Sequence, residues 1–83
     1  MKVTVKYFAS VREALGQGSE TIDTSVSNLA ALRDELIARG GAHAQALARG
    51  KAVRVALNQV MSDESAALSE SCEVAFFPPV TGG

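Results

Sequence analysis

The chain has 83 residues, a formal net charge of −1 and 47% hydrophobic residues, which suits one domain and excludes a second. This charge offers no basic surface for nucleic acid, and a single cysteine excludes an intramolecular disulfide framework or a thiolate metal cluster. No apolar run is long enough to cross a bilayer, and the N-terminus lacks the apolar core of a signal peptide. We therefore expect a soluble cytoplasmic domain.

The first quarter of the sequence predicts two strands with a short helix between them. Residues 3–8 are rich in β-branched and aromatic types, and alternate side chains share one face. Ser10 is a candidate cap for a helical turn over residues 11–15, which Gly16 would end. Residues 20–24 predict a second strand, antiparallel to the first.

The middle of the sequence holds the clearest helix, which follows a candidate cap at Ser27. Its charged residues fall mostly off a single apolar stripe, so we expect one face of the helix to pack on a sheet. The stripe consists of Leu29, Leu32, Leu36 and Ile37. Gly40–Gly41 ends this helix, and the alanine-rich residues 42–49 predict a second, weaker helical segment.

The second half of the sequence predicts the remaining strands. Residues 52–57 alternate, Asn58–Gln59 suits a tight turn, residues 60–61 form a short strand, and residues 72–77 form the last strand. The strand and helix order ββαββ predicts an α+β roll of the β-grasp kind, with one main helix on one face of a mixed sheet. A ferredoxin-like βαββαβ arrangement is the alternative, and the weak second helix disfavours it.

Two residues inside the domain could carry chemistry, and the pattern favours a structural role for both. His43, the only histidine, lies in the alanine-rich segment with no carboxylate nearby in the sequence, so we expect a surface or half-buried helix residue. Cys72 could carry a persulfide or a thioester. However, alternation places it on the face of Val74 and Phe76, and no Lys or Arg is adjacent, which predicts an inert core thiol. The carboxylates show no metal-ligand spacing.

The C-terminal segment differs in character from the rest. Pro78 and Pro79 lack a backbone N–H and disfavour helix, so we expect a domain over residues 1–77 followed by a stiff, extended tail over residues 78–83. Gly82–Gly83 presents a terminal carboxylate flanked by residues without a Cβ. This shape suits a carboxylate that threads a narrow channel into the active site of another protein.

Residues 73–83, E-V-A-F-F-P-P-V-T-G-G, resemble the end of the small sulfur-carrier subunits of molybdopterin synthase, the MoaD family. Residues 5–13 resemble the family's strand that ends in F-A-x-x-R-E, and residues 55–59 resemble its V-A-x-N-x strand and turn. Tyr7 departs from the family pattern, in which an aliphatic residue is commoner. The resemblance implies a ubiquitin-like β-grasp fold.

The resemblance also implies a two-stage role for Gly83. An adenylyltransferase of the ubiquitin-activating type would use Mg-ATP to convert its carboxylate to an acyl-adenylate, and a sulfur donor enzyme would displace AMP to leave a thiocarboxylate. The tail would then enter the large synthase subunit, in a heterotetramer, and give its sulfur to a cyclic pyranopterin monophosphate to form the dithiolene of molybdopterin. No cofactor or metal would be bound to this chain. The threading residues would be Pro78, Pro79, Val80, Thr81 and Gly82.

The residues beside the tail predict a docking surface, and the tail leaves other functions open. Phe76 and Phe77 point to opposite faces, so we expect one in the core and the other exposed, where it would dock to the large subunit and the activating enzyme. A thiamine-thiazole sulfur carrier, or a ubiquitin-like modifier joined to lysines through Gly83, would use the same kind of tail. A β-grasp interaction module with an unused tail is the remaining alternative.

Overall fold

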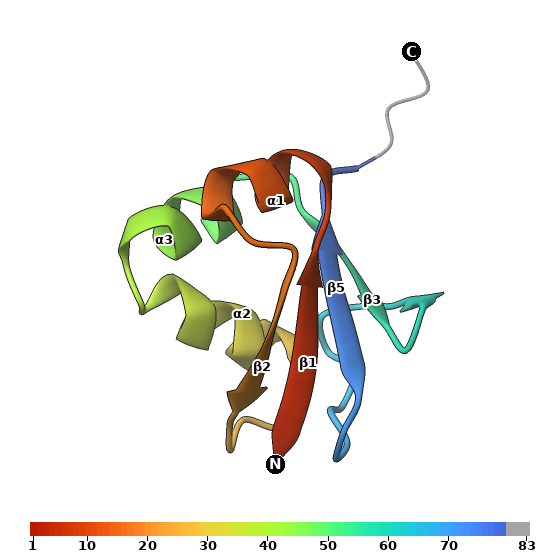
Figure 1. Ribbon diagram of the computed structural model, residues 1–83. Coiled ribbons are helices and arrows are strands. Elements are labelled where there is room, and N and C mark those ends of the chain that lie inside the picture. The colour runs from red at the N-terminus through yellow and green to blue at the C-terminus, as the bar shows by residue number, and fades with distance from the viewer. Residues whose placement is uncertain (80–83) are drawn as a thin grey trace.

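The chain forms a five-stranded sheet with helices on one face and at one end (Figure 1). A computed structural model describes residues 1–79, and the predictions on Val80, Thr81, Gly82 and Gly83 lie outside the described residues. The elements in chain order are β1 (Lys2–Tyr7), α1 (Ala9–Leu15), β2 (Ser19–Asp23), α2 (Leu29–Ile37), α3 (Gly41–Leu47), β3 (Arg54–Leu57), β4 (Val60–Met61) and β5 (Glu73–Phe77).

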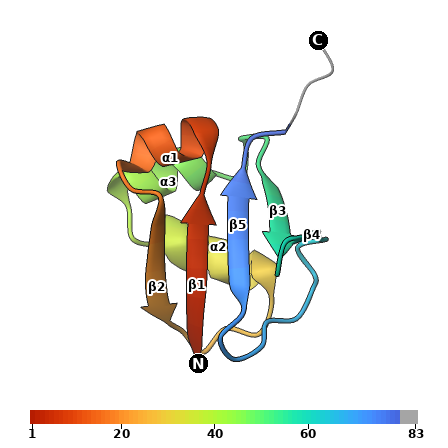
Figure 2. The same ribbon diagram turned by 45° about the vertical axis from the view of Figure 1, so that its right-hand side comes forward.

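The sheet is mixed, with strand order β2-β1-β5-β3-β4. β1 pairs with β5 in parallel, and the other pairs are antiparallel. The first and last strands therefore lie side by side in the middle and run toward the same end (Figure 2). This arrangement confirms the predicted α+β class. The two short helices α1 and α3 correspond to the predicted helical turn and weaker helical segment, beside the ββαββ order of the main elements.

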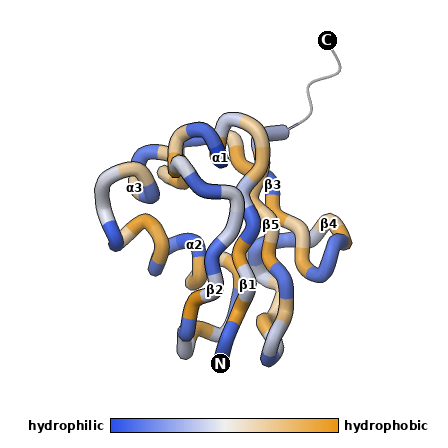
Figure 3. Tube along the Cα trace, in the orientation of Figure 1, coloured by the Kyte–Doolittle hydropathy of each residue, from blue (hydrophilic) through white to orange (hydrophobic). Residues whose placement is uncertain are grey.

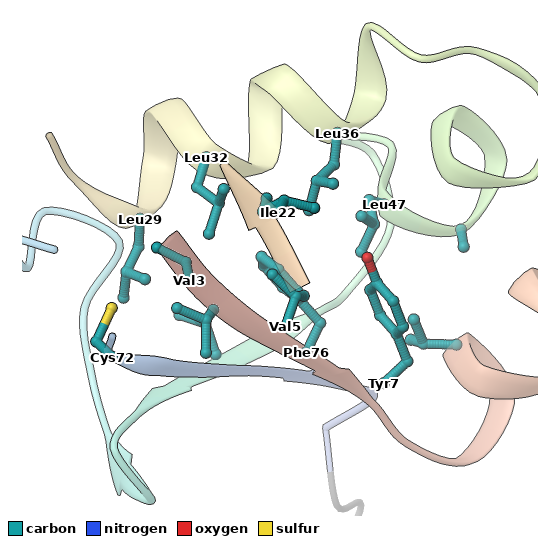
Figure 4. Packing of buried hydrophobic residues seen from close by; sticks show 14 residues of the cluster. Val3, Val5, Tyr7, Ile22, Leu29, Leu32, Leu36, Leu47, Cys72 and Phe76 are labelled. Atoms are coloured by element: carbon teal, nitrogen blue, oxygen red, sulfur yellow. The ribbon is translucent and has the colours of Figure 1, made fainter. Parts of the chain in front are cut away.

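The core lies between one face of the sheet and α2 (Figures 3 and 4). Alternation buries every second residue of β1 and places Val74 and Phe76 of β5 in the core, as predicted, and α2 places its leucine stripe against them. Ala75, between these two on the other face, is also buried. Each such side chain contributes roughly 1.5–3 kcal/mol of transfer free energy. The residues with at most 2% of their surface exposed are Val3, Val5, Tyr7, Leu29, Leu32, Leu36, Leu47, Cys72, Val74 and Phe76.

Both helix starts differ from the prediction. α2 begins after Asn28, whose side-chain oxygen accepts a hydrogen bond from the backbone N–H of Ala31 at 2.8 Å, so Ser27 is not the cap. α1 begins at Ala9 and has no side-chain cap, so Ser10 lies inside its first turn. Ser, Asn and Asp are nearly equivalent caps, and neighbouring candidates cannot be ranked by type alone.

The predicted turns are confirmed by backbone angles. Gly16 ends α1 with a φ of 72°, a conformation that glycine adopts without strain. Asn58 and Gln59 both have positive φ, 50° and 69°, in the tight turn between β3 and β4. Among residues 1–79, no helix has the length and hydropathy that crossing a membrane would require.

A buried arginine joins α2 to the segment that leads into β3. Arg33 is only 4% exposed, although the charged residues of this helix were expected on its solvated face. Its guanidinium donates to the carbonyl oxygens of Leu47, Ala48 and Lys51 at 2.8, 2.8 and 3.3 Å, and to Glu64 Oε2 at 2.9 Å. Arg33 therefore fixes residues 47–51, which follow α3, against the helix.

Candidate functional site at the base of the tail

The tail begins where β5 ends, and the two phenylalanines there have different environments. Phe76 is 1% exposed and stacks on Tyr7, with ring centroids 6.4 Å apart. Phe77, on the opposite face, is half-buried, as are Pro78 and Pro79. Phe76 therefore offers a partner no surface, and the docking prediction now rests on Phe77.

Apolar side chains surround Phe77 on the open face of the sheet. The register places Ala75 beside Ala56, and Ala56 opposite Met61 of β4. Phe8 continues β1 in extended conformation, and its N–H donates to the carbonyl oxygen of Phe76 at 3.1 Å, which brings it next to Phe77. Phe8 and Met61 are 47% and 58% exposed, Phe77 is half-buried, and Ala56 and Ala75 beneath them are buried. We call Phe8, Ala56, Met61, Ala75 and Phe77 the tail-base patch.

Charged residues border the tail-base patch. Lys6 Nζ lies 3.3 Å from Glu73 Oε1, and Arg54 is the register partner of Phe77. An exposed apolar surface with a polar rim is typical of a protein-binding site. Large side chains around small alanines make a shallow surface, which suits a protein partner better than a small ligand.

A second polar cluster, absent from the sequence prediction, centres on Glu20 of β2. Tyr7 Oη donates to its Oε2 at 2.7 Å, Arg39 Nη1 donates to its Oε1 at 2.6 Å, and His43 Nε2 lies 2.9 Å from its Oε2. These residues come from β1, from the end of α2 and from α3. His43 is half-buried, as expected, but it does have a carboxylate partner, 23 residues away in the sequence.

The cluster strongly favours the ionised form of Glu20. Burial alone would raise its pKa, but the hydrogen bonds with His43, Arg39 and Tyr7 outweigh burial and lower the pKa from 4.5 to about 2. Burial, followed by the hydrogen bond to Glu20, raises the pKa of the Tyr7 hydroxyl far above its usual value. Tyr7 therefore acts as a neutral donor to a fixed carboxylate at any physiological pH.

The lowered pKa of Glu20 predicts a pH-dependent loss of stability in Glu20→Gln. A depressed carboxyl pKa stabilises the fold above its unfolded value of 4.5, and this stabilisation disappears as the pH falls toward about 2. Glu20→Gln should therefore lower the free energy of unfolding by about 2–3 kcal/mol at pH 7, and much less at pH 2.5. Urea unfolding at both pH values measures the difference.

The matched control for Glu20→Gln is Glu13→Gln, at an exposed position of α1. It should change the free energy of unfolding by less than about 0.5 kcal/mol at either pH. If Glu20→Gln lowered the free energy of unfolding equally at pH 7 and pH 2.5, the cluster would stabilise the fold through packing and not through the charge of Glu20.

The cysteine inside the domain lies as the sequence predicted. Cys72 is 2% exposed within the core, so a reagent cannot reach its thiol in the folded domain. Within residues 1–79, no three His, Cys, Asp or Glu side chains are placed to hold a metal ion. The site that remains is the base of the tail.

Comparison with known sequences supports the resemblance over nearly the whole chain. A family model described as "ThiS family" matches residues 5–83. The "Molybdopterin synthase sulfur carrier subunit" of Haemophilus influenzae is 37% identical over 81 residues, covering 98% of this chain and 99% of that protein. The protein of the same name from Escherichia coli is 38% identical over 81 residues, with the same coverage.

Solved structures share the fold. A putative molybdopterin converting factor subunit 1 from Pyrococcus furiosus superposes with a TM-score of 0.80 at 26% identity, covering 96% of this chain and 99% of that one. The small archaeal modifier protein 1 of Haloferax volcanii has a TM-score of 0.70 at 26% identity, with 95% and 98% covered. A chain from the complex of subunits 1 and 2 of the Helicobacter pylori molybdopterin-converting factor shares the fold at 24% identity and a TM-score of 0.69, with both chains fully covered.

Proposed function

We propose, because the chain belongs to the ThiS family, that it is the sulfur-carrier subunit of a molybdopterin synthase. The observation that carries this proposal is the likeness to two carrier subunits of that name over 98% of the chain. The tail, with its two prolines and terminal Gly82–Gly83, supports it. The tail-base patch supplies an apolar surface on which the larger subunit would dock.

The proposed chemistry starts at the carboxylate of Gly83. Its oxygen attacks the α-phosphorus of ATP on an adenylyltransferase, pyrophosphate leaves, and the acyl carbon gains AMP as a good leaving group. The terminal sulfur of a persulfide on a donor enzyme then attacks the acyl carbon and AMP leaves, giving an acyl disulfide. A thiol on the donor side then supplies the two electrons that cleave its S–S bond, and this releases the thiocarboxylate and leaves a disulfide on the donor. In the larger subunit the thiocarboxylate sulfur would form a C–S bond to the pterin as an oxygen substituent leaves that carbon. Water would then hydrolyse the acyl–sulfur bond, so that Gly83 regains its carboxylate and the sulfur stays on the pterin.

In this proposal the partner enzymes supply the acid–base groups and the phosphate contacts. This chain positions the carboxylate of Gly83. β5 is a central strand, held by β1 on one side and β3 on the other, so the start of the tail at Pro78 is fixed relative to the patch. Fixing both the docking surface and the origin of a short tail limits where the reactive end can lie.

Mass spectrometry of the protein purified from its native cells tests the proposal. The expected result is a fraction of intact chains with the mass gain of one oxygen replaced by sulfur, and an alkylating reagent should add one alkyl group to this fraction alone. Reconstitution with the larger subunit and a cyclic pyranopterin should then consume this species and produce a dithiolene. A thiocarboxylate consumed only by thiazole synthesis would instead indicate a thiamine-thiazole carrier.

A ubiquitin-like modifier is the second candidate, favoured by the likeness to the small archaeal modifier protein 1. Both functions begin with acyl adenylation, so they differ only in the acceptor. Isopeptide adducts between Gly83 and lysines of other proteins would support the modifier. Their absence from cells that contain the thiocarboxylate would support the carrier.

Substitutions of the two phenylalanines next to the tail should separate a loss of partner binding from a loss of stability. Phe77→Ala removes a half-buried ring from the tail-base patch, so we expect binding to the larger subunit to weaken by 10-fold or more, about 1.4 kcal/mol. Phe76→Ala removes a ring that is 1% exposed and should cost about 3–5 kcal/mol of stability. Calorimetric titration and thermal unfolding measure the two effects. Equal losses of stability would contradict the assignment of Phe77 to the docking surface.

A further inference from the structure

A small cavity lies beside the tail, on the side of the sheet that carries the helices. Its volume is about 130 Å³. It is open to solvent, and its walls come from α1, from α3, from the segment that enters β3 and from the first residue of the tail, with Ser10 and Lys51 as polar lining residues. The main apolar lining residues are Val11, Ala14, Ala46, Ala52, Val53 and Pro78.

The cavity lies on the opposite side of the sheet from the tail-base patch. Phe77 points to the open face of the sheet, while Pro78, the next residue, lines the cavity on the other side. The tail therefore starts between two apolar surfaces. A partner that encloses the tail down to its base must cover both of them.

One lining residue of the cavity is basic. Lys51 is exposed there, and within residues 1–79 its side chain forms no ion pair. A carboxylate on the partner, next to the side chain that fills the cavity, would complement this charge.

We infer that the cavity receives an apolar side chain of the larger subunit, flanked there by a carboxylate, as a second anchor for the base of the tail. This inference rests on the proposed function and names a contact that function does not require. The volume of about 130 Å³ is close to the roughly 150 Å³ that hold a benzene molecule, and the apolar lining residues would contact the seated side chain. An anchor on each side of the tail would fix its direction as well as its position.

Filling the cavity from either wall tests the inference. Ala14→Leu on α1 and Ala52→Leu on the facing segment each place a larger side chain at an exposed lining position. Each should weaken binding of the full-length chain to the larger subunit by at least about 10-fold in calorimetric titration. Thermal unfolding should be unchanged, or slightly raised by Ala14→Leu, because leucine is tolerated in a helix.

The matched control is Ala38→Leu, at an exposed position with helical backbone at the end of α2, outside the cavity. It should bind the larger subunit like the unmodified chain. Lys51→Glu should weaken binding several-fold at low ionic strength, and the defect should shrink at high salt because exposed charges are screened.

The outcomes separate this inference from the proposed function. If the unmodified chain does not bind the larger subunit, the proposed function fails and the inference fails with it. If it binds, and both filled variants bind equally well, only the inference is overturned. If Ala14→Leu instead dissociates a self-associated form of the chain, seen by sedimentation, the occupant is a second copy and the inference is likewise overturned.

Discussion

Deletion of Gly83 should abolish thiocarboxylate formation while the domain stays folded. The deletion moves the terminal carboxylate back by up to about 3.5 Å, and a misplacement of about 1 Å in a positioned reaction can cost about 100-fold in rate. The core lies within residues 3–76, so thermal unfolding should not change. The measurement is thiocarboxylate formed per minute with the activating enzyme, Mg-ATP and a sulfur source.

Adding one glycine after Gly83 is the matched control for length. The extended chain also ends in a glycine carboxylate and keeps every native residue. However, its reacting carbon lies one residue too far along the channel of the activating enzyme. We expect the same loss of sulfur transfer, with docking through the tail-base patch retained. Sulfur loading of the shortened chain at the unmodified rate would contradict the requirement for a carboxylate at position 83. Mass spectrometry of fragments would then show whether the sulfur is on the new terminus at Gly82 or elsewhere in the chain.

Replacement of Arg33 by methionine should cause a large loss of stability. Three backbone carbonyls and Glu64 accept hydrogen bonds from this guanidinium, and methionine would leave them without their donor. Breaking such a buried charged network costs about 3–5 kcal/mol, a large part of the 5–15 kcal/mol that is typical of a whole domain. Urea unfolding at pH 7 measures the change.

Arg49→Met provides the matched control, because Arg49 also pairs with Glu64 but lies at the surface, with 45% of its side chain exposed. Exposed ion pairs contribute about 0–1 kcal/mol, so the control should cost far less than Arg33→Met. Arg33→Lys should be intermediate, since lysine keeps the charge but cannot donate in several fixed directions. Equal costs at positions 33 and 49 would show that burial of the guanidinium contributes nothing.

The fold could be predicted from the sequence wherever a local pattern decides the structure. Alternation in β1 and β5, the leucine stripe of α2 and the turn at Asn58–Gln59 depend on spacing and residue type, and each is confirmed. The buried position of Phe76 follows from its place in a strand, once the neighbouring strands are known. Periodicity alone could not decide which of the two phenylalanines is covered.

The polar contacts could not be predicted, because they join residues far apart in the sequence. Glu20 meets Arg39 and His43 only because the end of α2 and α3 lie over β2, and no local pattern places them there. Arg33 occupies a helix position next to the leucine stripe, where a long side chain reaches the backbone of residues 47–51. The sequence pattern of such residues is that of solvent-exposed positions, and only the packing of distant segments buries them.

The central position of β5 also affects how the domain folds during synthesis. Residues 2–7 and 73–77 come from the two ends of the chain, yet they pair directly in the middle of the sheet. At about 5–20 residues per second, a ribosome needs several seconds between making the first strand and the last. During that interval β1 can pair only with β2, and its other edge is open. The sheet closes only after Phe77 has left the ribosome, so a nascent chain exposes apolar surface until its last strand arrives.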